Sequence, residues 1–557
     1  MSNIELSSNF GQIRTLVTNM QTRNIYKWGS PEVEEKLPEH TLKFLEEQFP
    51  VDKEFKASLP KGELPLNSLK KSKLSQATIT KLKQIVGKDY VLLDDSSRAR
   101  HSIGKFYTEI YRARFGEVSD VVDVVVSPKN EAEVIEVIAL ANAGKIPVIP
   151  YGAGSTVTKA LQAPKGGISL DLSRLNRIIE FNAIDSTVTV EAGVYGPVLE
   201  KHLNERGYTC GHFPQSFEFS TVGGWIAAKG AGQASTGYGK IEDILLSLTA
   251  ITPSGKFESK AYPAASIGPD LFRLFLGTEG SFGVITKATL KIRKFHPENS
   301  AKGSFIFKNF EKAVETMRDV MQAGFGKPHF FRIQDPEETD ISFHMSGLHG
   351  GKEDLFLRFI GYKPMERSLM HIIVDGDPSY AKEVLKKIKK IAKRNGGFST
   401  GESPVNKWLH QRYSSAYLRD YLMDEGIRID TLETAVSWSN LHELWEKTRA
   451  YIKSHENTSC MVHISHAYEN GANLYFIFLS PIKGKNEITD FIKFHKGIID
   501  SIHKHGGSLS HHHGIGRMLS PWMEGEVGKE GLRILSSIKK TFDPKGIMNP
   551  GGLLGLK

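Results

Sequence analysis

The stretch from Ser119 to Thr156 shows a clear succession of apolar and polar segments. An apolar run, "VVDVVV", precedes a proline turn, an amphipathic segment, "NEAEVIEVIALANAG", and a second apolar run, "IPVIP". Short apolar runs bounded by turns predict buried strands, and the periodicity between them predicts a helix. The pattern therefore predicts a strand–helix–strand unit that ends on the glycine-rich turn "YGAGST".

Further along the chain, β-branched segments alternate with turns at 166–176, 177–194 and 283–294, and a helix is predicted at 195–207. From about Pro297 a new unit begins, with helices predicted at 309–324 and 380–397 and strands at 355–362 and 371–377. The last 60 or so residues contain a helix ending near Gly506, a histidine loop and another helix. Mixed helices and strands of this kind predict an α+β fold.

The predicted organisation has four parts. These are an N-terminal basic helical or extended arm (1–115), a nucleotide-binding domain (116–296), a sheet-and-helix domain that caps it (297–500), and a C-terminal helical segment (501–557). A chain of 557 residues is too long for one hydrophobic core, which agrees with several domains. The helix at 382–394 is basic and amphipathic; it either lies on a membrane or covers a sheet, and the second interpretation is favoured.

Composition and charge exclude few functions. The contents of hydrophobic residues, 39%, and of charged residues, 24%, are those of an ordinary globular protein. A net charge of +9 is compatible with nucleic acid, anionic membranes or phosphorylated substrates. The two cysteines, Cys210 and Cys460, form no zinc pattern and favour a reducing compartment. We find no secretory signal, no window of 18 apolar residues and no SKL-type peroxisomal address.

Glycines gather in three further segments besides "YGAGST": "FSTVGGW", "GYGKIED" and "GTEGSFGVIT". Gly152 and Gly154 follow a predicted strand, where such a turn presents backbone N–H groups to a pyrophosphate. Val157 stands where the third glycine of a G-x-G-x-x-G fingerprint would be, so this turn alone is weak evidence. Glycine at this density is costly unless the backbone approaches a bulky ligand closely.

These motifs, followed by "GGSLSHHHGIG" at 506–516, resemble in their order the FAD-binding oxidoreductases of the vanillyl-alcohol oxidase (PCMH-type) superfamily, and within it the alkyldihydroxyacetonephosphate synthase branch. The resemblance covers about Ser119 to Gly552. It implies a PCMH-type FAD-binding domain, an α+β cap domain and FAD as the cofactor. Because residues 150–160 contain neither His nor Cys, we expect the FAD to be bound non-covalently.

The resemblance implies that the FAD contacts the glycine-rich segments. The residues expected to bind it are Pro150, Tyr151, Gly152, Ala153, Gly154, Ser155, Thr156, Pro214, Ser216, Phe219, Ser220, Thr221, Gly223, Gly224, Ser235, Thr236, Gly237, Tyr238, Glu279, Gly280, Gly283, Val284 and Ile285.

The resemblance also implies an activity. Alkyldihydroxyacetonephosphate synthases replace the acyl chain of acyl-dihydroxyacetone phosphate by a fatty alcohol, through a flavin N5 adduct and without net redox. By position, Tyr475, His511, His512 and His513 would serve as acid-base groups, and Arg419 and Arg332 would hold a phosphate or carboxylate. Tyr475 would need a lowered pKa to act as a base. Two chain-bearing substrates demand an apolar tunnel. Two interpretations are open for the Phe-rich segments "HFFRI", "LFLRFIGY" and "LYFIFL": they line this tunnel, or their rings pack in the core.

Partners and location follow the same reasoning. The substrates would be acyl-dihydroxyacetone phosphate and a fatty alcohol, with a peripheral membrane contact through the basic helix or the arm, and a homodimer by analogy. No RNA-binding aromatic motif is visible, so a nucleic-acid-binding protein ranks far below an enzyme. The location would be cytoplasmic or membrane-peripheral in a prokaryote and peroxisomal in a eukaryote.

The alternative activity is an oxidase or dehydrogenase of a 2-hydroxy acid, such as D-lactate or 2-hydroxyglutarate. In that branch a divalent metal is held by H-x-G-D-G-N-L-H and G-E-H-G-I-G motifs. Here Tyr475 and His512 replace a histidine and the glutamate, which disfavours a hard metal, so we expect no metal, although His466, His511 and His513 remain candidate zinc ligands. In an extended loop, His511 and His513 would point one way and His512 the other.

Overall fold

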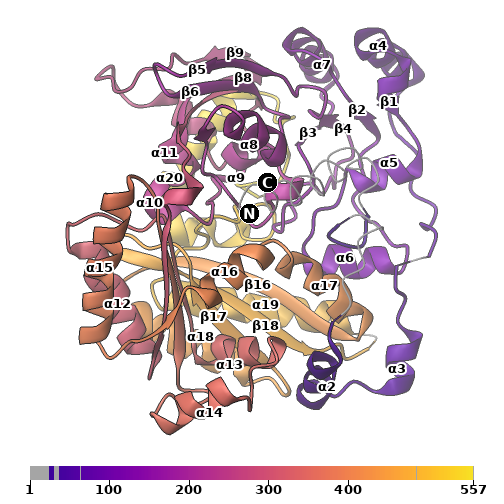
Figure 1. Cartoon of the computed structure of the whole chain (residues 1–557). Coiled ribbons are helices and arrows are strands. Elements are labelled where there is room, and N and C mark those ends of the chain that lie inside the picture. Colours follow the sequence, from indigo (N-terminus) through magenta and orange to yellow (C-terminus); the bar gives the residue numbers. More distant parts are fainter. Residues whose placement is uncertain (1–23, 30–36, 63, 485, 556–557) are drawn as a thin grey trace.

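The computed structural model describes residues 24–29, 37–62, 64–484 and 486–555 (Figure 1). The start of the predicted arm, residues 1–23, lies outside the described residues. Two lobes are visible. The small-sheet lobe contains the sheets formed by residues 91–294, and the large-sheet lobe is built around one seven-stranded sheet formed by residues 301–481.

The first sheet of the small-sheet lobe has the order β1(Val91–Leu92)-β2(Val124–Val126)-β4(Ile168–Asp171)-β3(Val148–Tyr151). The predicted strand–helix–strand unit is confirmed as β2, α7(Glu131–Gly144) and β3. Both strands run parallel to β4, which lies between them. The glycine-rich turn therefore leaves the sheet at the carboxyl end of a parallel strand, a common place for a nucleotide site.

The second sheet of this lobe is antiparallel, with the order β5(Ile178–Asn182)-β6(Thr187–Glu191)-β10(Val284–Lys291)-β8(Leu245–Thr252)-β9(Gly255–Glu258). The predicted strands at 166–176, 177–194 and 283–294 are confirmed, as is the helix at 195–207, which is α8(Gly196–Asn204). Three short helices, α9(Val222–Ala228), α10(Ser235–Tyr238) and α11(Ile241–Ile244), follow, and β7(Tyr208–Thr209) pairs with β11(Arg293–Lys294). Short 3-10 turns occur at Phe217–Phe219, Leu271–Phe275 and Pro297–Asn299.

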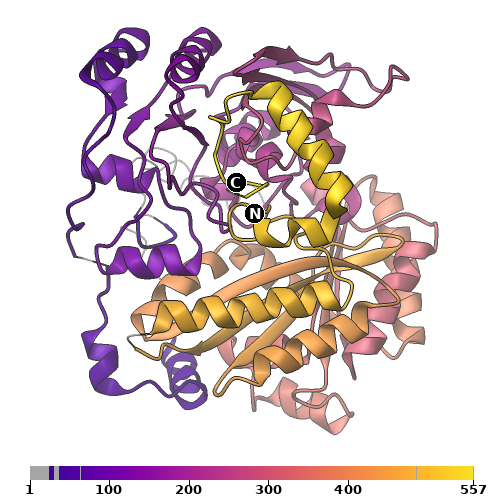
Figure 2. The same ribbon diagram turned by 180° about the vertical axis from the view of Figure 1, so that it is seen from behind.

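The seven-stranded sheet is antiparallel throughout. Its order is β15(Phe398–Gly401)-β12(Ala301–Phe307)-β14(Ser368–Val374)-β13(Phe330–Gln334)-β17(Ser459–Ile464)-β18(Gly471–Pro481)-β16(Ile427–Ser437). Figure 1 shows α13(Pro336–Met345), α16(Ser403–Gln411) and α17(Ser415–Asp424) on the near side, and Figure 2 shows α18(Leu441–Lys453) and α19(Glu487–Lys504) across the sheet from behind.

Alternation along β18 assigns its side chains to these two faces. Phe476 and Phe478 are fully buried, and Phe478 packs against the α19 ring of Phe494 at 5.2 Å. Tyr475 and Ile477 therefore point to the opposite face, toward α13 and α17. One face of the sheet forms a core, and the other is free to line a site.

The predicted helices at 309–324 and 380–397 are confirmed as α12(Phe310–Gln322) and α15(Pro378–Arg394). The apolar side of α15, including Val384 and Ile388, is buried and packs against β12 and β14, so the helix covers a sheet as favoured. The strand predicted at 355–362 is wrong, since this segment lies in α14(Lys352–Phe359) and the turn after it. An Asp354–Arg358 ion pair four residues apart supports the helix, and only Leu357 of its apolar residues is buried.

The helices on the N-terminal side and the C-terminal helix pack against the two lobes. On the N-terminal side, α2(Glu39–Gln48) packs against α13, and α4(Gln76–Val86) packs against α7. The other helices of this region are α3(Lys53–Ser58), α5(Asp95–Arg100) and α6(Tyr107–Arg114), with a 3-10 turn at Lys88–Tyr90. After the turn Ser520–Trp522, α20(Met523–Phe542) returns to the small-sheet lobe (Figure 2). Among the described residues, no helix combines the length and apolar character needed to cross a bilayer.

Candidate active site

A cavity of about 980 Å³ lies between the two lobes. One side is formed by the glycine-rich loops after β3 and around α9, and the other by the free face of the seven-stranded sheet. Most residues predicted to bind the cofactor line it: Pro150, Tyr151, Gly152, Ala153, Gly154, Ser155, Thr156, Pro214, Ser216, Ser220, Thr221, Gly223, Gly224, Glu279, Gly280, Gly283 and Ile285. Motifs that are far apart in the sequence thus meet at one cavity.

The remaining predicted cofactor residues do not line the cavity: Phe219, Ser235, Thr236, Gly237, Tyr238 and Val284. Several of them join the lobes instead. The Ser235 hydroxyl bonds to Nδ1 of His466 at 2.6 Å, and the Thr236 hydroxyl accepts the N–H of Ala467 at 3.2 Å. Tyr238 donates its hydroxyl to Asp375. The "ASTGYG" motif therefore positions the large-sheet lobe over the cavity.

The donors exposed by the first glycine-rich turn fit a pyrophosphate. Among the described residues, the backbone N–H groups of Gly154, Ser155 and Thr156 donate to no protein acceptor. Gly154 has φ +67°, a conformation that a side chain would disfavour. Consecutive free N–H groups in such a turn bind anions. The cavity and its donors suit FAD, with the pyrophosphate at this turn.

Glu279 connects two of the motifs beneath the cavity. Its carboxylate accepts the N–H groups of Ile515 (3.2 Å) and Gly516 (2.5 Å) and the hydroxyl of Thr158 (3.0 Å). A Cβ on Gly514 would lie 2.7 Å from the Glu279 carboxylate, which explains the glycine there. Burial raises the pKa of Glu279 to about 7 against these hydrogen bonds.

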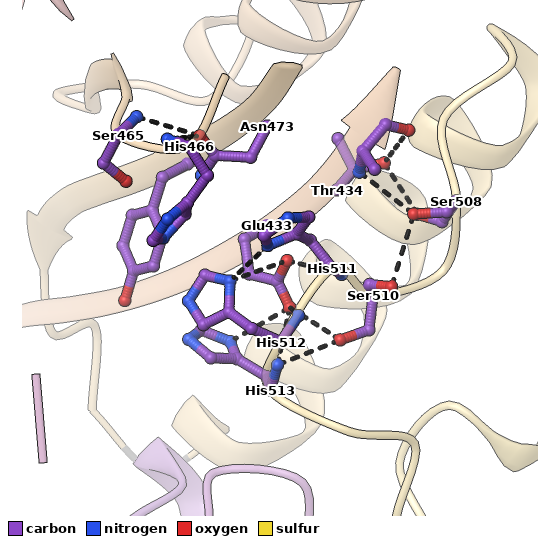
Figure 3. Close-up of polar contacts among 12 residues, drawn as sticks. Glu433, Thr434, Ser465, His466, Asn473, Ser508, Ser510, His511, His512 and His513 are labelled. Atoms are coloured by element: carbon purple, nitrogen blue, oxygen red, sulfur yellow. Dashed lines mark hydrogen bonds and ion pairs between the residues drawn. The ribbon is translucent and has the colours of Figure 1, made fainter. Parts of the chain in front are cut away.

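The histidine loop is held by one buried carboxylate (Figure 3). Glu433, on β16, accepts the backbone N–H groups of His511 (2.6 Å), His512 (3.1 Å) and His513 (2.9 Å), and the hydroxyl of Ser510 (2.6 Å). Burial would raise the pKa of Glu433, but the nearby histidines and these donors lower it to about 2. Glu433 is therefore a carboxylate at neutral pH.

The expected alternation of the three histidines is wrong, because the loop is bent rather than extended. The backbone wraps around Glu433, and His512 and His513 both line the cavity, with ring centroids 4.7 Å apart. His511 points away from it. Its Nε2 bonds to the hydroxyl of Tyr468 at 2.6 Å and its Nδ1 to Nδ1 of His512 at 2.9 Å.

Burial lowers the pKa of each of these rings, that of His512 to about 3. The rings are therefore neutral near pH 7, and each neutral ring has a lone pair that can accept a hydrogen bond. His466, His511 and His512 offer ligand atoms within 4.8 Å of one another. These candidate zinc ligands differ from the predicted set in one residue, because His512 takes the place of His513.

Tyr475 lies beside this cluster. Its ring is stacked on His463, at 4.7 Å, and faces His512, at 5.8 Å, while its hydroxyl donates to Thr431 Oγ1 at 3.2 Å. Tyr475 lacks the lowered pKa that a base would need: its pKa is raised to about 12, chiefly by burial and also by Glu433 and Asp430, and Thr431 and Arg419 only partly oppose this. Tyr475 is a protonated phenol, suited to donating a hydrogen bond rather than to acting as a resting base.

The two arginines differ in how much of each guanidinium is free. Arg419, on α17, lines the cavity and donates through Nη1 to the carbonyl oxygen of Lys105 at 2.5 Å. Its Nε and Nη2 are buried and, among the described residues, have no partner. Burial lowers the pKa of Arg419, although Asp420 and Asp430 oppose it. An unpartnered pair of guanidinium donors of this kind is suited to an oxyanion.

Arg332 also lines the cavity, but it is already paired. Its Nη2 donates to Glu338 at 2.6 Å, and the other oxygen of Glu338 bonds to Nδ1 of His463 at 3.0 Å. This ion pair is not at the surface, because Glu338 is buried. Arg332 therefore supports the His463 ring beneath Tyr475.

Several functional candidates were missed by sequence reasoning: Glu433, Lys240, His463, Glu338 and His212. Lys240 donates to the carbonyl oxygen of His511 at 2.6 Å. His212 lines the cavity, fully buried, and among the described residues neither ring nitrogen has a partner. The histidine in "CGHFPQS" stood next to a recognised motif and was a usable signal. Glu433 sits in a β-branched strand with no motif around it.

The fold and the site define a FAD-binding protein of the PCMH type. Residues 122–259 match the family described as "FAD binding domain" and residues 296–553 the family "FAD linked oxidases, C-terminal domain". The alkyldihydroxyacetonephosphate synthase of Dictyostelium discoideum is 32% identical over 86% of this chain and 80% of the relative. The chain belongs to the alkyldihydroxyacetonephosphate synthase family, and FAD is its cofactor.

Other comparisons agree. The Trypanosoma brucei brucei protein of the same name is 30% identical over 92% of this chain and 87% of its own length. A solved alkyldihydroxyacetonephosphate synthase structure superposes with a TM-score of 0.79 at 30% identity, covering 94% of both chains. A mitochondrial D-lactate dehydrogenase [cytochrome] of Arabidopsis thaliana is more distant, at 27% identity over 85% of this chain and 80% of its own length.

Proposed function

We propose that this protein catalyses the exchange of the acyl chain of 1-acyl-dihydroxyacetone phosphate for a fatty alcohol, which forms the ether bond of ether lipids. The observation that carries the proposal is the free guanidinium fork of Arg419, in the same cavity as Tyr475 and the neutral histidines. A phosphate-bearing, chain-bearing ketone needs such an anion site, proton-transfer groups and an apolar wall. The names of the relatives support the same activity.

The reaction balances without an electron acceptor. The bond between C1 and the acyl oxygen breaks and the fatty acid leaves; the bond between C1 and the alcohol oxygen forms, and the hydroxyl proton is released. FAD, when bound, supplies the group that keeps C1 activated between these two events. The protein must therefore supply a group that accepts a proton and groups that stabilise the negative charge of the phosphate or the departing carboxylate.

Each polar side chain has a role in this scheme. His512 or His513, neutral and lining the cavity, accepts a hydrogen bond from the alcohol on a ring nitrogen and takes the proton as the bond to C1 forms, when the hydroxyl becomes acidic. Tyr475, protonated, donates a hydrogen bond to oxygen at C1 or C2. Arg419 binds the phosphate or the departing carboxylate through Nε and Nη2. Arg332, paired with Glu338, keeps the His463 ring in place rather than binding the anion directly.

Of the two interpretations of the Phe-rich segments, tunnel lining holds for few of the rings. Of the aromatic residues in the three segments, Phe330 and Tyr475 line the cavity, whereas Phe476 and Phe478 lie in the core behind the sheet, and Phe356 and Phe359 are exposed. The apolar wall is instead formed by Ile, Leu and Met side chains: Ile341, Met345, Leu418, Ile429, Met461 and Ile477. Aliphatic walls of this kind suit a hydrocarbon chain.

The substrates would be drawn from a membrane surface, so the proposal includes a peripheral contact with lipid. The basic helix α15 uses its apolar side within the protein, which leaves α14 as the better candidate. On α14, Phe359 is 88% exposed, and Leu355 and Phe356 are about half exposed. This helix follows α13, whose Met345 and Ser346 line the cavity. A homodimer and a reducing compartment, in which the buried cysteines stay free, complete the proposal.

The test is an anaerobic titration of the flavin-loaded protein. Palmitoyl-dihydroxyacetone phosphate should bleach the oxidised flavin band, and hexadecanol should restore it without any acceptor while an ether product forms. Bleaching by D-lactate or 2-hydroxyglutarate that only an electron acceptor reverses would instead establish the dehydrogenase activity. In that case the His466, His511 and His512 cluster would be examined for a bound metal.

A further inference from the structure

The face of the seven-stranded sheet that lines the cavity changes from polar to apolar along the strands. One cross-strand row consists of Glu433, Tyr475 and His463. The next row on the same face consists of Thr431, Ile477 and Met461. Rows two residues apart are separated by about 7 Å. A substrate whose reacting carbon lies at Tyr475 would therefore extend its chain over Ile477 and Met461.

Beyond these rows, the wall of the cavity comes from the N-terminal arm. Leu37, Pro38 and Thr41, at the start of α2, line the same cavity as Ile341, Met345 and Leu418. Thr41 is fully buried. Leu45 and Phe49, at the end of this arm segment, pack with Ile341, Ile429 and Met461 in one hydrophobic cluster. The helix α2 therefore covers the apolar end of the sheet face.

The arm is firmly anchored. The N–H of Trp28 donates to both carboxylate oxygens of Asp420, at 2.9 and 2.8 Å. Lys105 donates through Nζ to the carbonyl oxygens of Asn24 (2.8 Å), Ile25 (3.2 Å) and Lys27 (2.6 Å).

On α2 itself, the ring of Phe44 stacks on His344 at 4.2 Å. Because Asp420 and Arg419 are neighbours on α17, and Arg419 bonds to the Lys105 carbonyl, the arm and the anion site share one scaffold.

We propose that α2 sets the length of the hydrocarbon chain that the cavity accepts, with Thr41 as the limiting side chain. This inference rests on the proposed function for the nature of the substrate. Thr41 is small and lies at the apolar wall, so the volume in front of it decides how many methylenes fit. Each methylene that loses its place in an apolar site costs about fourfold in apparent affinity.

The experiment compares octanol, dodecanol and hexadecanol as substrates of the flavin-loaded protein and of its Thr41→Phe and Thr41→Ala variants. Thr41→Phe should lower kcat/KM for hexadecanol by about tenfold or more and leave octanol within about twofold. Thr41→Ala should not lower kcat/KM for hexadecanol. Glu47→Phe, on the exposed side of α2, is the matched control and should leave the chain-length profile unchanged.

A second variant and a second measurement keep the test decisive. Leu37 lines the cavity and is only half-buried, so a tryptophan there does not have to fit into the core. The Leu37→Trp variant should therefore discriminate against long chains even if Thr41→Phe fails to fold. Binding of octanoate and palmitate, followed by calorimetry without turnover, should show the same discrimination.

An equal loss for all chain lengths, or no change, would overturn the inference. Absence of ether product from the unmodified protein would instead refute the proposed function, and the binding comparison would still test α2.

Discussion

The backbone N–H of His511 donates to Oε2 of Glu433 at 2.6 Å, although the two residues lie 78 positions apart in the chain. The same carboxylate accepts two further N–H groups and a hydroxyl from the loop, and Thr434 and Ser508 extend the network (Figure 3). The hydrogen bonds to Glu433 therefore stabilise the bent loop in which His512 and His513 line the cavity.

Glu433→Gln should therefore disorganise the histidine loop. The amide keeps one acceptor oxygen but turns donor hydrogens toward backbone N–H groups, leaving buried donors unsatisfied at about 1–3 kcal/mol each. We expect a lower Tm, kcat reduced by about 100-fold, and a changed flavin spectrum. Glu180→Gln, on the exposed strand β5, is the control. Full activity of Glu433→Gln would contradict the role assigned to the carboxylate.

Tyr475→Phe keeps the stacked ring and removes only the hydroxyl. If the phenol stabilises charge on the substrate oxygen, kcat should fall by about 100-fold or more while FAD content and Tm stay close to those of the unmodified protein. Single-turnover bleaching of the flavin measures this directly. A decrease in Tm with little change in the rate of bleaching would mean that the hydroxyl serves packing through Thr431 instead.

Substitution by lysine, which keeps the charge and removes the guanidinium fork, should affect different kinetic constants at Arg419 and Arg332. Arg419→Lys should raise KM for the phosphate-bearing substrate by about 10- to 100-fold, since a charge-assisted hydrogen bond contributes about 1.5–3 kcal/mol. Inorganic phosphate should inhibit this variant less than the unmodified protein. Arg332→Lys should mainly lower kcat, by moving His463. The opposite split would assign the anion site to Arg332.

Glu279 predicts a pH dependence of stability. Its pKa in the folded protein is raised to about 7 by burial, from 4.5. Between about pH 4.5 and pH 7 the folded state keeps a proton that the unfolded state loses. The contribution of protonated Glu279 to the free energy of unfolding is therefore full below about pH 4.5 and is lost as pH rises through about 7. It amounts to on the order of 3 kcal/mol. Glu279→Gln should flatten the decline in Tm over this window; an unchanged decline would place its origin elsewhere.

The contact with lipid predicts a role for α14. Phe359→Ser should reduce sedimentation of the protein with vesicles of phosphatidylcholine and phosphatidylglycerol, and should raise KM only for substrates presented in vesicles. Activity on detergent-dispersed substrate should not change. Ile184→Ser, which removes another highly exposed apolar side chain from a turn of the small-sheet lobe, is the control. Equal binding by both variants would exclude α14 as the contact.

Much of the site followed from local patterns. Glycines at 152, 154 and 280 indicated close backbone approach, and the family resemblance implied acid-base chemistry for the "HHHGIG" loop. The structure brings these segments to one cavity, as their order implied. The missing parts are those contributed by single residues on strands, such as His463 and Glu338, because a lone polar residue in a strand carries no local signal of what it will face.

The sequence by itself determined the elements, the nucleotide-binding turns, the family and the set of histidines, since periodicity and motifs are local properties of the chain. Only the tertiary structure decided that α14 is a helix with an exposed apolar side, that the histidine loop bends around Glu433, and that the arm helix α2 walls the cavity. It also decided that the pKa of Tyr475 is raised rather than lowered, because burial, which arises only when distant segments pack together, outweighs the nearby Arg419 charge.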